Sequence, residues 1–152
     1  MSGFSFDTSA LIGAHNEVYR PATFPGLWRN LEAMIANGEL FCSEEVLHEL
    51  ERQDDELLQW AKAQAGLFVA MDGAIEAAVK RVVAIPNAVK GTSTENAADP
   101  FVVAVAIVRS ATVVSREGPG SAQRPKIPYL CGQLGVGHQS LEDFVTGQGW
   151  SF

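Results

Sequence analysis

Four acidic residues are the part of the sequence that could do chemistry together: Asp7, Glu49, Asp99 and Glu117. Hard divalent cations such as Mg²⁺ and Mn²⁺ prefer oxygen ligands, and proteins hold them with a few carboxylates and the phosphates of a substrate. Carboxylates gathered in one place repel one another unless a cation joins them or one of them takes up a proton. If the fold brings these four together, we therefore expect a site for a divalent cation.

Each of these acids also has an ordinary structural explanation. Asp7 could end a strand in an Asx turn, and Asp99 before Pro100 could simply cap a helix. Glu49 lies among other acids on a predicted helix, and Glu117 lies in a predicted loop, where carboxylates are usually solvated. The joint pattern favours a metal site, because two acids follow strands and a third begins a helix.

Two predicted strands would place acids at the same edge of a sheet. Residues 4–9 begin with apolar and polar residues in alternation, which predicts a short strand that turns at Asp7. Residues 111–115 form a β-branched run that predicts a buried strand ending just before Glu117. Strands that alternate with helices imply right-handed crossovers. We expect a three-layer α/β/α fold with a short, mostly parallel central sheet, in which ligands bind beyond the carboxyl ends of the strands.

Apolar spacing and breaker residues predict the other elements. Helices are expected over residues 25–37, 43–50, 55–66, 74–83, 99–108 and 141–145, with a second strand at residues 39–42. Asp99 is expected to cap its helix, with Pro100 at the first helical position. Residues 68–71 are ambiguous between strand and helix, residues 90–96 and 118–124 are typical of loops, and residues 126–131 are expected to form a final edge strand.

Length and composition are typical of one compact domain in the cytoplasm. A chain of 152 residues, 47% of them hydrophobic, can bury a single core, and no apolar run approaches the ~20 residues that cross a bilayer. Cys42 and Cys131 lie far apart without a metal-binding motif, so we expect reduced thiols. A formal charge of −7 argues against broad adhesion to nucleic acid, unless bound cations reverse the potential locally.

The order of the acidic motifs resembles the PIN-domain family over nearly the whole chain. The segments that carry the resemblance are FDTSALI at 6–12, VLHEL at 46–50, ADPFVVA at 98–104 and VVSRE at 113–117, and a PIN-like branch also shows FPGLW at 24–28 and KIP at 126–128. The resemblance implies a single PIN-like nuclease domain over residues 1–152. It further implies a metal-dependent ribonuclease, which in prokaryotes is commonly the toxin of a toxin–antitoxin pair.

Position by position, the resemblance assigns roles to the acids and to two hydroxyls. Asp7, Glu49 and Asp99 match the three principal acids of the family, and Glu117 matches a less constant fourth, where many members have aspartate. Ser9 and Ser115 match small hydroxyl positions that support the acids, although threonine is frequent at the second position. We expect Asp7 and Asp99 to hold Mg²⁺ or Mn²⁺, Glu49 to position or deprotonate a water, and Glu117 to help bind a second cation.

The expected partners are RNA and an inhibitory protein. Four basic residues near the acids in sequence would contact the RNA backbone or simply balance neighbouring acids: Lys90, Arg116, Arg124 and Lys126. A cognate antitoxin would lay an arginine or lysine over the clustered carboxylates. The family likeness also suggests a homodimer, and no membrane partner is expected.

Two other functions stay open at this stage. An aspartate-nucleophile phosphohydrolase would also place Asp7 at the end of a first strand, but it needs a second aspartate where this chain has Ser9. The other alternative is a catalytically inactive PIN-like scaffold or binding protein, whose acids have structural roles only.

Overall fold

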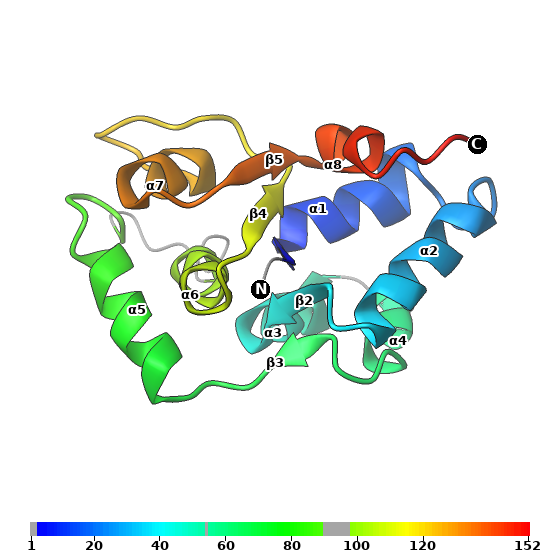
Figure 1. Cartoon of the computed structure of the whole chain (residues 1–152), viewed down its shortest axis with the longest axis horizontal. Helices are drawn as coiled ribbons and strands as arrows, with labels where there is room; N and C mark the ends of the chain where they lie inside the picture. The colour runs from blue at the N-terminus through cyan, green and yellow to red at the C-terminus, as the bar shows by residue number, and fades with distance from the viewer. Residues whose placement is uncertain (1–2, 54, 90–97) are drawn as a thin grey trace.

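The described part of the chain forms a sheet of five parallel strands with helices around it (Figure 1). The computed structural model describes residues 3–53, 55–89 and 98–152. The strands are β1 (Phe4–Phe6), β2 (Leu40–Ser43), β3 (Phe68–Val69), β4 (Thr112–Ser115) and β5 (His138–Ser140). Their order in the sheet is β3-β2-β1-β4-β5, and every neighbouring pair is parallel. The predicted α/β fold is therefore confirmed.

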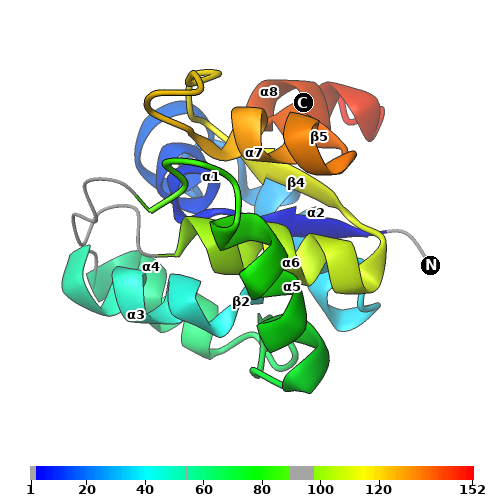
Figure 2. The ribbon, with the colours of Figure 1, turned by 90° about the vertical axis from the view of Figure 1, so that its left-hand side faces the viewer.

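The helices cover both faces of this sheet. They are α1 (Thr8–Gly13), the π-helix η1 (Ala14–Val18), α2 (Pro25–Ala36), α3 (Glu44–Gln53), α4 (Asp55–Lys62), α5 (Gly73–Val83), α6 (Asp99–Arg109), α7 (Ile127–Leu134) and α8 (Leu141–Gly147). Figures 1 and 2 show α5, α6 and α7 on one side of the strands and α1, α2 and α8 on the other. Within the described residues, no helix is long and apolar enough to cross a membrane.

Helix α6 is the centre of one layer, as its composition predicts. It lies against β1, β2 and β4, and its residues 102–106 are all buried. The hydroxyl of Ser5 in β1 donates a hydrogen bond of 2.9 Å to the Val102 carbonyl, so the buried serine has a partner. Because α6 is fixed against three strands, its first residue, Asp99, is held at the edge where those strands end.

Strands β1 and β4 lie side by side in register. Phe4 pairs with Thr112 and Phe6 with Val114, so the residues that follow the two strands leave the sheet at the same edge. The backbone N–H of Asp7 donates to the Val114 carbonyl at 2.9 Å and continues this pairing by one residue. The sheet thus places the first and the last acid of the candidate set next to each other.

The predicted edge strand at residues 126–131 is wrong, because residues 127–134 form helix α7. Lys126 is an extended N-cap residue, and Pro128 lies in the first turn, where a helix needs no donor from its backbone nitrogen. The real edge strand, β5, has the short polar sequence His138-Gln139-Ser140, which shows no apolar alternation. A strand of this kind can be identified only in the structure, from its pairing with β4.

Other boundaries differ more modestly from the prediction. Ala98, not Asp99, is the N-cap of α6, and Asp99 is its first helical residue with no capping hydrogen bond. Helix α4 ends at Lys62 because residues 63–66 form turns that finish at Gly66, with φ 86°. The turn expected after β1 continues as α1 and η1, and the ambiguous segment at 68–71 contains β3. The loop predicted at 90–96, with Lys90, lies outside the described residues.

Candidate metal centre

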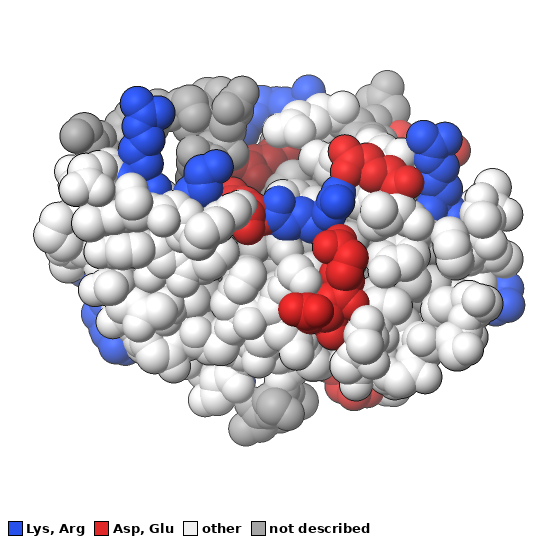
Figure 3. Space-filling model, turned by 90° about the horizontal axis from the view of Figure 1, so that it is seen from above, with Lys and Arg blue, Asp and Glu red and all other residues white. Residues whose placement is uncertain are grey.

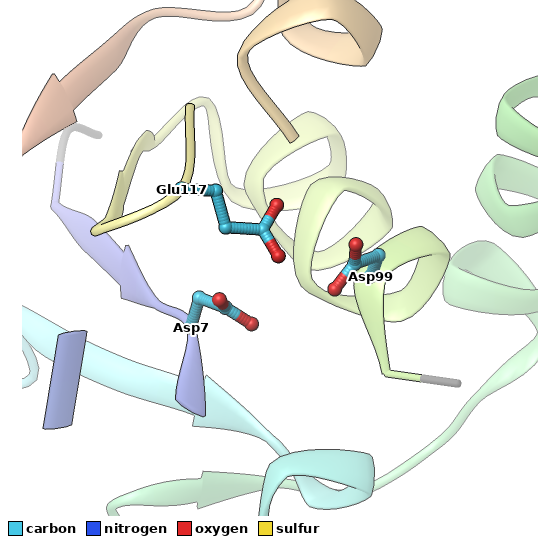
Figure 4. A group of neighbouring side chains, drawn as sticks. All are labelled: Asp7, Asp99 and Glu117. Carbon is cyan, nitrogen blue, oxygen red and sulfur yellow. The ribbon is translucent and has the colours of Figure 1, made fainter. Parts of the chain in front are cut away.

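Three carboxylates from separate elements converge at the carboxyl edge of the sheet (Figure 4). Asp7 directly follows β1, Glu117 follows β4 by two residues, and Asp99 begins α6. One oxygen atom of each side chain lies within 4.8 Å of those of the other two. Figure 4 shows the three side chains pointing toward one another across a common space. This is the spacing at which a single cation can be shared.

The triad lines a hollow of about 460 Å³ together with other residues of α1 and α3. The lining residues are Asp7, Thr8, Ser9, Ile12, Glu49, Gln53, Asp99 and Glu117. Asp7 is 2% exposed and Asp99 is 7% exposed, so both carboxylates are largely removed from solvent. All four acids predicted from the sequence therefore lie around one hollow.

Glu49 lies at this hollow but outside the set that meets the spacing of a shared cation. Its Oε1 accepts a hydrogen bond of 2.5 Å from the Thr8 hydroxyl, and its Oε2 accepts one of 3.3 Å from the Ala98 backbone. Glu49 thus links α1 to the start of α6, the two segments that carry Asp7 and Asp99. Thr8 was not predicted, because a hydroxyl at the first position of a helix is usually explained by local capping.

Ser9 and Ser115 both contact the acids or the backbone beside them. The Ser9 hydroxyl donates to Asp7 Oδ2 at 2.6 Å and accepts from the Arg116 backbone at 3.0 Å. Ser115 Oγ lies 2.8 Å from His138 Nε2 and accepts from the backbone N–H of Glu117 at 3.5 Å. The two serines therefore tie the loop after β4 to α1 and to β5.

Glu117 is oriented from its other side by α7. The backbone N–H of Ile127, the first residue of that helix, donates to Glu117 Oε1 at 3.0 Å. Helix N-termini favour negative charge, so this contact lowers the pKa of Glu117 and partly offsets the effect of its burial. The segment that was predicted as a strand is thus part of the site, and its helical geometry is what supplies the donor.

Asp99 differs from its neighbours because the described residues give its carboxylate no hydrogen bond. Burial, and then the charges of Asp7, Glu117 and Glu49, raise the pKa of Asp99 to about 9. Burial is also the main cause of a raised pKa at Asp7, Glu49 and Glu117. Without a cation, these four carboxyl groups either hold protons at neutral pH or repel one another. A cation bound among these carboxylates would favour their ionised forms and relieve the repulsion.

The predicted basic residues have different surroundings. Arg116 is ion-paired with Glu17 and, at 3.1 Å, with Glu142, so it balances neighbouring acids. Arg124 is exposed. Lys126 is also exposed, and its positive charge lowers the pKa of both Asp99 and Glu117. Lys90 lies outside the described residues.

Gly13 has a role in this arrangement that the sequence alone does not reveal. The side chain of Arg116 crosses α1 at this position, and a Cβ atom on Gly13 would collide with Cδ of Arg116. A glycine is therefore required if Arg116 is to reach Glu17 and Glu142. The need arises from contact between residues more than one hundred positions apart, so no local pattern signals it.

Charge on the surface above α7, β5 and α8 is mixed (Figure 3). Seen from this side, Lys and Arg side chains alternate with Asp and Glu among the residues that the structure describes. A cation bound in the acidic hollow would add positive charge at the carboxyl edge of the sheet.

Both cysteines are buried and free, as predicted. Burial raises the pKa of the Cys131 thiol to about 12 and also raises that of Cys42, so both stay protonated and unreactive. Neither provides a ligand to the acidic hollow. The chemistry of this site is therefore that of oxygen ligands alone among the residues that line it.

Comparison with known proteins places the chain in a family without assigning it an activity. No curated protein matches the sequence. Residues 4–152 match the family described as "Domain of unknown function (DUF4411)". Because this match covers nearly the entire sequence, the chain belongs to the DUF4411 family.

Proposed function

We propose that the protein is a metal-dependent endoribonuclease of the PIN type, and that Asp7, Asp99 and Glu117 hold Mg²⁺ or Mn²⁺. The observation that carries the proposal is the meeting of three carboxylates from β1, α6 and the loop after β4 within 4.8 Å. The sequence motifs that resemble the PIN family are the same motifs that supply these residues. Their convergence at the ligand-binding edge of a parallel sheet agrees with such an activity.

The residues fit a hard divalent cation better than a structural role. A buried carboxylate that stabilises a fold normally accepts hydrogen bonds or pairs with a base. Asp99 does neither among the described residues, although it is only 7% exposed. Glu117 leaves Oε2 without a described partner, since Ile127 donates to Oε1. Both groups therefore keep oxygen lone pairs available for a cation.

The chain's own residues would divide the work of phosphodiester hydrolysis. A bound divalent cation would supply Lewis-acid polarisation of the phosphate and make a nearby water more acidic. Glu49 would take the proton from the attacking water, because an ionised carboxylate has about four lone-pair sites and Thr8 and Ala98 use only two. Glu117 would help hold a second cation, which would stabilise the charge that develops on the leaving oxygen. Water would add to phosphorus as the bond to the 3′ oxygen breaks, which leaves a 5′-phosphate and a 3′-hydroxyl.

The biological setting that we propose is a prokaryotic toxin–antitoxin pair in the cytoplasm. A basic side chain from an antitoxin would find unpaired carboxylate oxygens in the hollow and would displace the cation that activity needs. A homodimer is also consistent with the family resemblance. Co-purification with a small protein encoded next to this gene would support the toxin role.

An aspartate-nucleophile phosphohydrolase is less well supported by the site. That chemistry needs an acid two positions after the nucleophile, and Ser9 stands there with its hydroxyl bound to Asp7 at 2.6 Å. A phosphatase assay on small phosphoesters separates the two enzymes, because the nuclease should leave such substrates intact.

The test is cleavage of RNA by the purified protein with and without Mn²⁺. Mixed cellular RNA should be cut only with the metal, and Asp7→Asn should abolish cutting while keeping the helix cap, since Asn caps as well as Asp. Asp72→Asn is the matched control, because Asp72 caps α5 in the same way but does not line the hollow, so this change should not affect cutting. Products that end in 2′,3′-cyclic phosphates, or cutting that Asp7→Asn does not reduce, would contradict the proposal.

A further inference from the structure

A second hollow, of about 400 Å³, follows the metal centre along the same two segments. It is lined by His15, Asn16, Arg20, Pro21, Ala22 and Glu56. The first hollow includes Ile12 and Gln53, so both walls advance by three residues between one hollow and the next. Along α1 and η1, three residues are about one helical turn, or about 5 Å, so the two hollows are neighbours along that wall.

His15 is the buried polar group of this second hollow. It is 8% exposed, and its ring packs edge-on against Trp28 with centroids 5.4 Å apart. Its Nδ1 lies 2.7 Å from the side-chain oxygen of Asn16, which can only accept, so Nδ1 carries the proton. Nε2 is then an acceptor, and the described residues offer it no hydrogen bond. The ring is thus fixed in place with one unused acceptor.

Arg20 provides a cation at the same hollow. Its Nε donates to the Asn16 carbonyl at 3.0 Å, and the described residues form no ion pair with its terminal nitrogens. Glu56 lines the hollow as well but does not pair with Arg20. A guanidinium that is anchored at Nε still presents its two terminal NH₂ groups, which suit a phosphate.

The segment that carries these groups has an uncommon conformation. Residues 14–18 form a π-helix that includes both His15 and Asn16. Such turns are rare and occur frequently at functional sites. A fixed acceptor, an anchored guanidinium and a π-helix therefore coincide beside the metal centre.

We infer that this second hollow binds the nucleotide next to the scissile bond of a single-stranded RNA, with Arg20 on a phosphate and His15 Nε2 accepting from a 2′-hydroxyl. The inference rests on the proposed function, because it states where the RNA substrate of that nuclease would lie beside the metal centre. A hollow of about 400 Å³ suits one unpaired nucleotide rather than a duplex. The 2′-hydroxyl is the group that distinguishes RNA from DNA.

The test measures binding of a labelled single-stranded oligouridylate by fluorescence anisotropy, with Mn²⁺, in an Asp7→Asn background that prevents cutting. Arg20→Ala should raise Kd by about 3- to 10-fold, as expected for an exposed charge-assisted contact. The slope of log affinity against log salt should also fall by about 0.7, because one phosphate contact is lost. Arg81→Ala is the matched control: Arg81 is exposed and lines a different hollow, so Kd and slope should not change.

His15→Phe provides the second arm and keeps the ring packing against Trp28. It should reduce the preference for oligouridylate over oligodeoxyuridylate of the same length. Equal effects of Arg20→Ala and Arg81→Ala, with an unchanged RNA preference in His15→Phe, would overturn the inference even if Mn²⁺-dependent cutting is found. Conversely, Arg20→Ala could weaken binding while the wild-type chain shows no Mn²⁺-dependent cutting. That result would support RNA binding at the second hollow and reject the proposed nuclease activity. Loss of a bound protein partner in Arg20→Ala, with RNA binding intact, would assign the hollow to that partner and overturn the RNA assignment.

Discussion

Two groups of charged residues lie beside the segment that follows β4, and they differ in whether the protein supplies a partner of opposite charge. Arg116 pairs with Glu17 and Glu142 at the surface, so those acids have a partner within the protein. Glu117, the next residue along the chain, points into the hollow toward Asp7 and Asp99. The charges of the first group are paired within the protein, as in a cluster that stabilises the fold. The second group forms no ion pair among the described residues, as expected if a bound cation is what neutralises it.

The largest effect should come from replacing Glu49, which lines the same hollow as the second group. Glu49→Gln should lower the rate of RNA cutting by about 10²- to 10⁴-fold, the range expected when a general base is lost. The carbonyl oxygen of glutamine can still accept from the Ala98 backbone, and its NH₂ group can donate to the Thr8 hydroxyl oxygen, so the fold should remain intact. Rates measured at saturating Mn²⁺ beside far-ultraviolet circular dichroism would check this. A rate within twofold of wild type would remove Glu49 from the mechanism.

The pH dependence of stability should reveal the same imbalance without any assay of activity. The folded pKa of Asp99, about 9, lies above its ordinary value of 3.8, so its contribution to stability is full at low pH and is lost as pH rises toward 9. In EDTA, Asp99→Asn should therefore become progressively more stable than wild type between pH 5 and pH 9. Urea denaturation at several pH values measures this difference, and a difference that stays constant or shrinks with pH would contradict it.

A smaller effect is expected at the junction between the two groups. Gly13→Ala should destabilise the fold by roughly 1–3 kcal/mol, because the new methyl group collides with the side chain of Arg116. The double variant Gly13→Ala with Arg116→Ala should recover most of that loss. If the single and the double variant are equally unstable in thermal melts, Gly13 is required for a reason other than the passage of Arg116.

The smallest effect should come from the surface group itself. Glu142→Gln removes one of two acids that pair with Arg116, and its side chain is 50% exposed. Exposed ion pairs contribute about 0–1 kcal/mol, so stability should fall by less than that and Mn²⁺ affinity should not change. A marked loss of Mn²⁺ affinity would show that the two groups are not independent.

The positions of the acids could be predicted because strong local patterns precede them. The alternating residues before Asp7, the β-branched run before Glu117 and the apolar helix after Asp99 each indicate an element whose end carries the acid. Parallel strands then bring two of these ends together. Glu49 follows no predicted strand and was assigned through the family resemblance, which does not show that Thr8 and Ala98 bind its two oxygens.

The parts that could not be predicted depend on contacts between distant segments. Residues 126–131 contain β-prone side chains, yet Pro128 is equally suited to the first turn of a helix, and packing decides in favour of α7. That choice places the Ile127 amide on Glu117. The need for glycine at position 13 is explained only by the side chain of Arg116, which lies against it. The hollow at His15 forms only because Glu56 of α4 lies on its other side. Such features require the assembled fold.

Direct measurement of Mn²⁺ binding by isothermal titration calorimetry tests the central claim, that the three converging carboxylates form a cation site. The wild-type chain at pH 7.5 should bind Mn²⁺ and release protons, because carboxyl groups with raised pKa values must give up protons to the metal. Asp99→Asn should lose most of the affinity, and the cap variant Asp72→Asn, whose residue does not line the hollow, should bind like wild type. Absence of binding by the folded wild-type chain, or equal binding by both variants, would contradict the account.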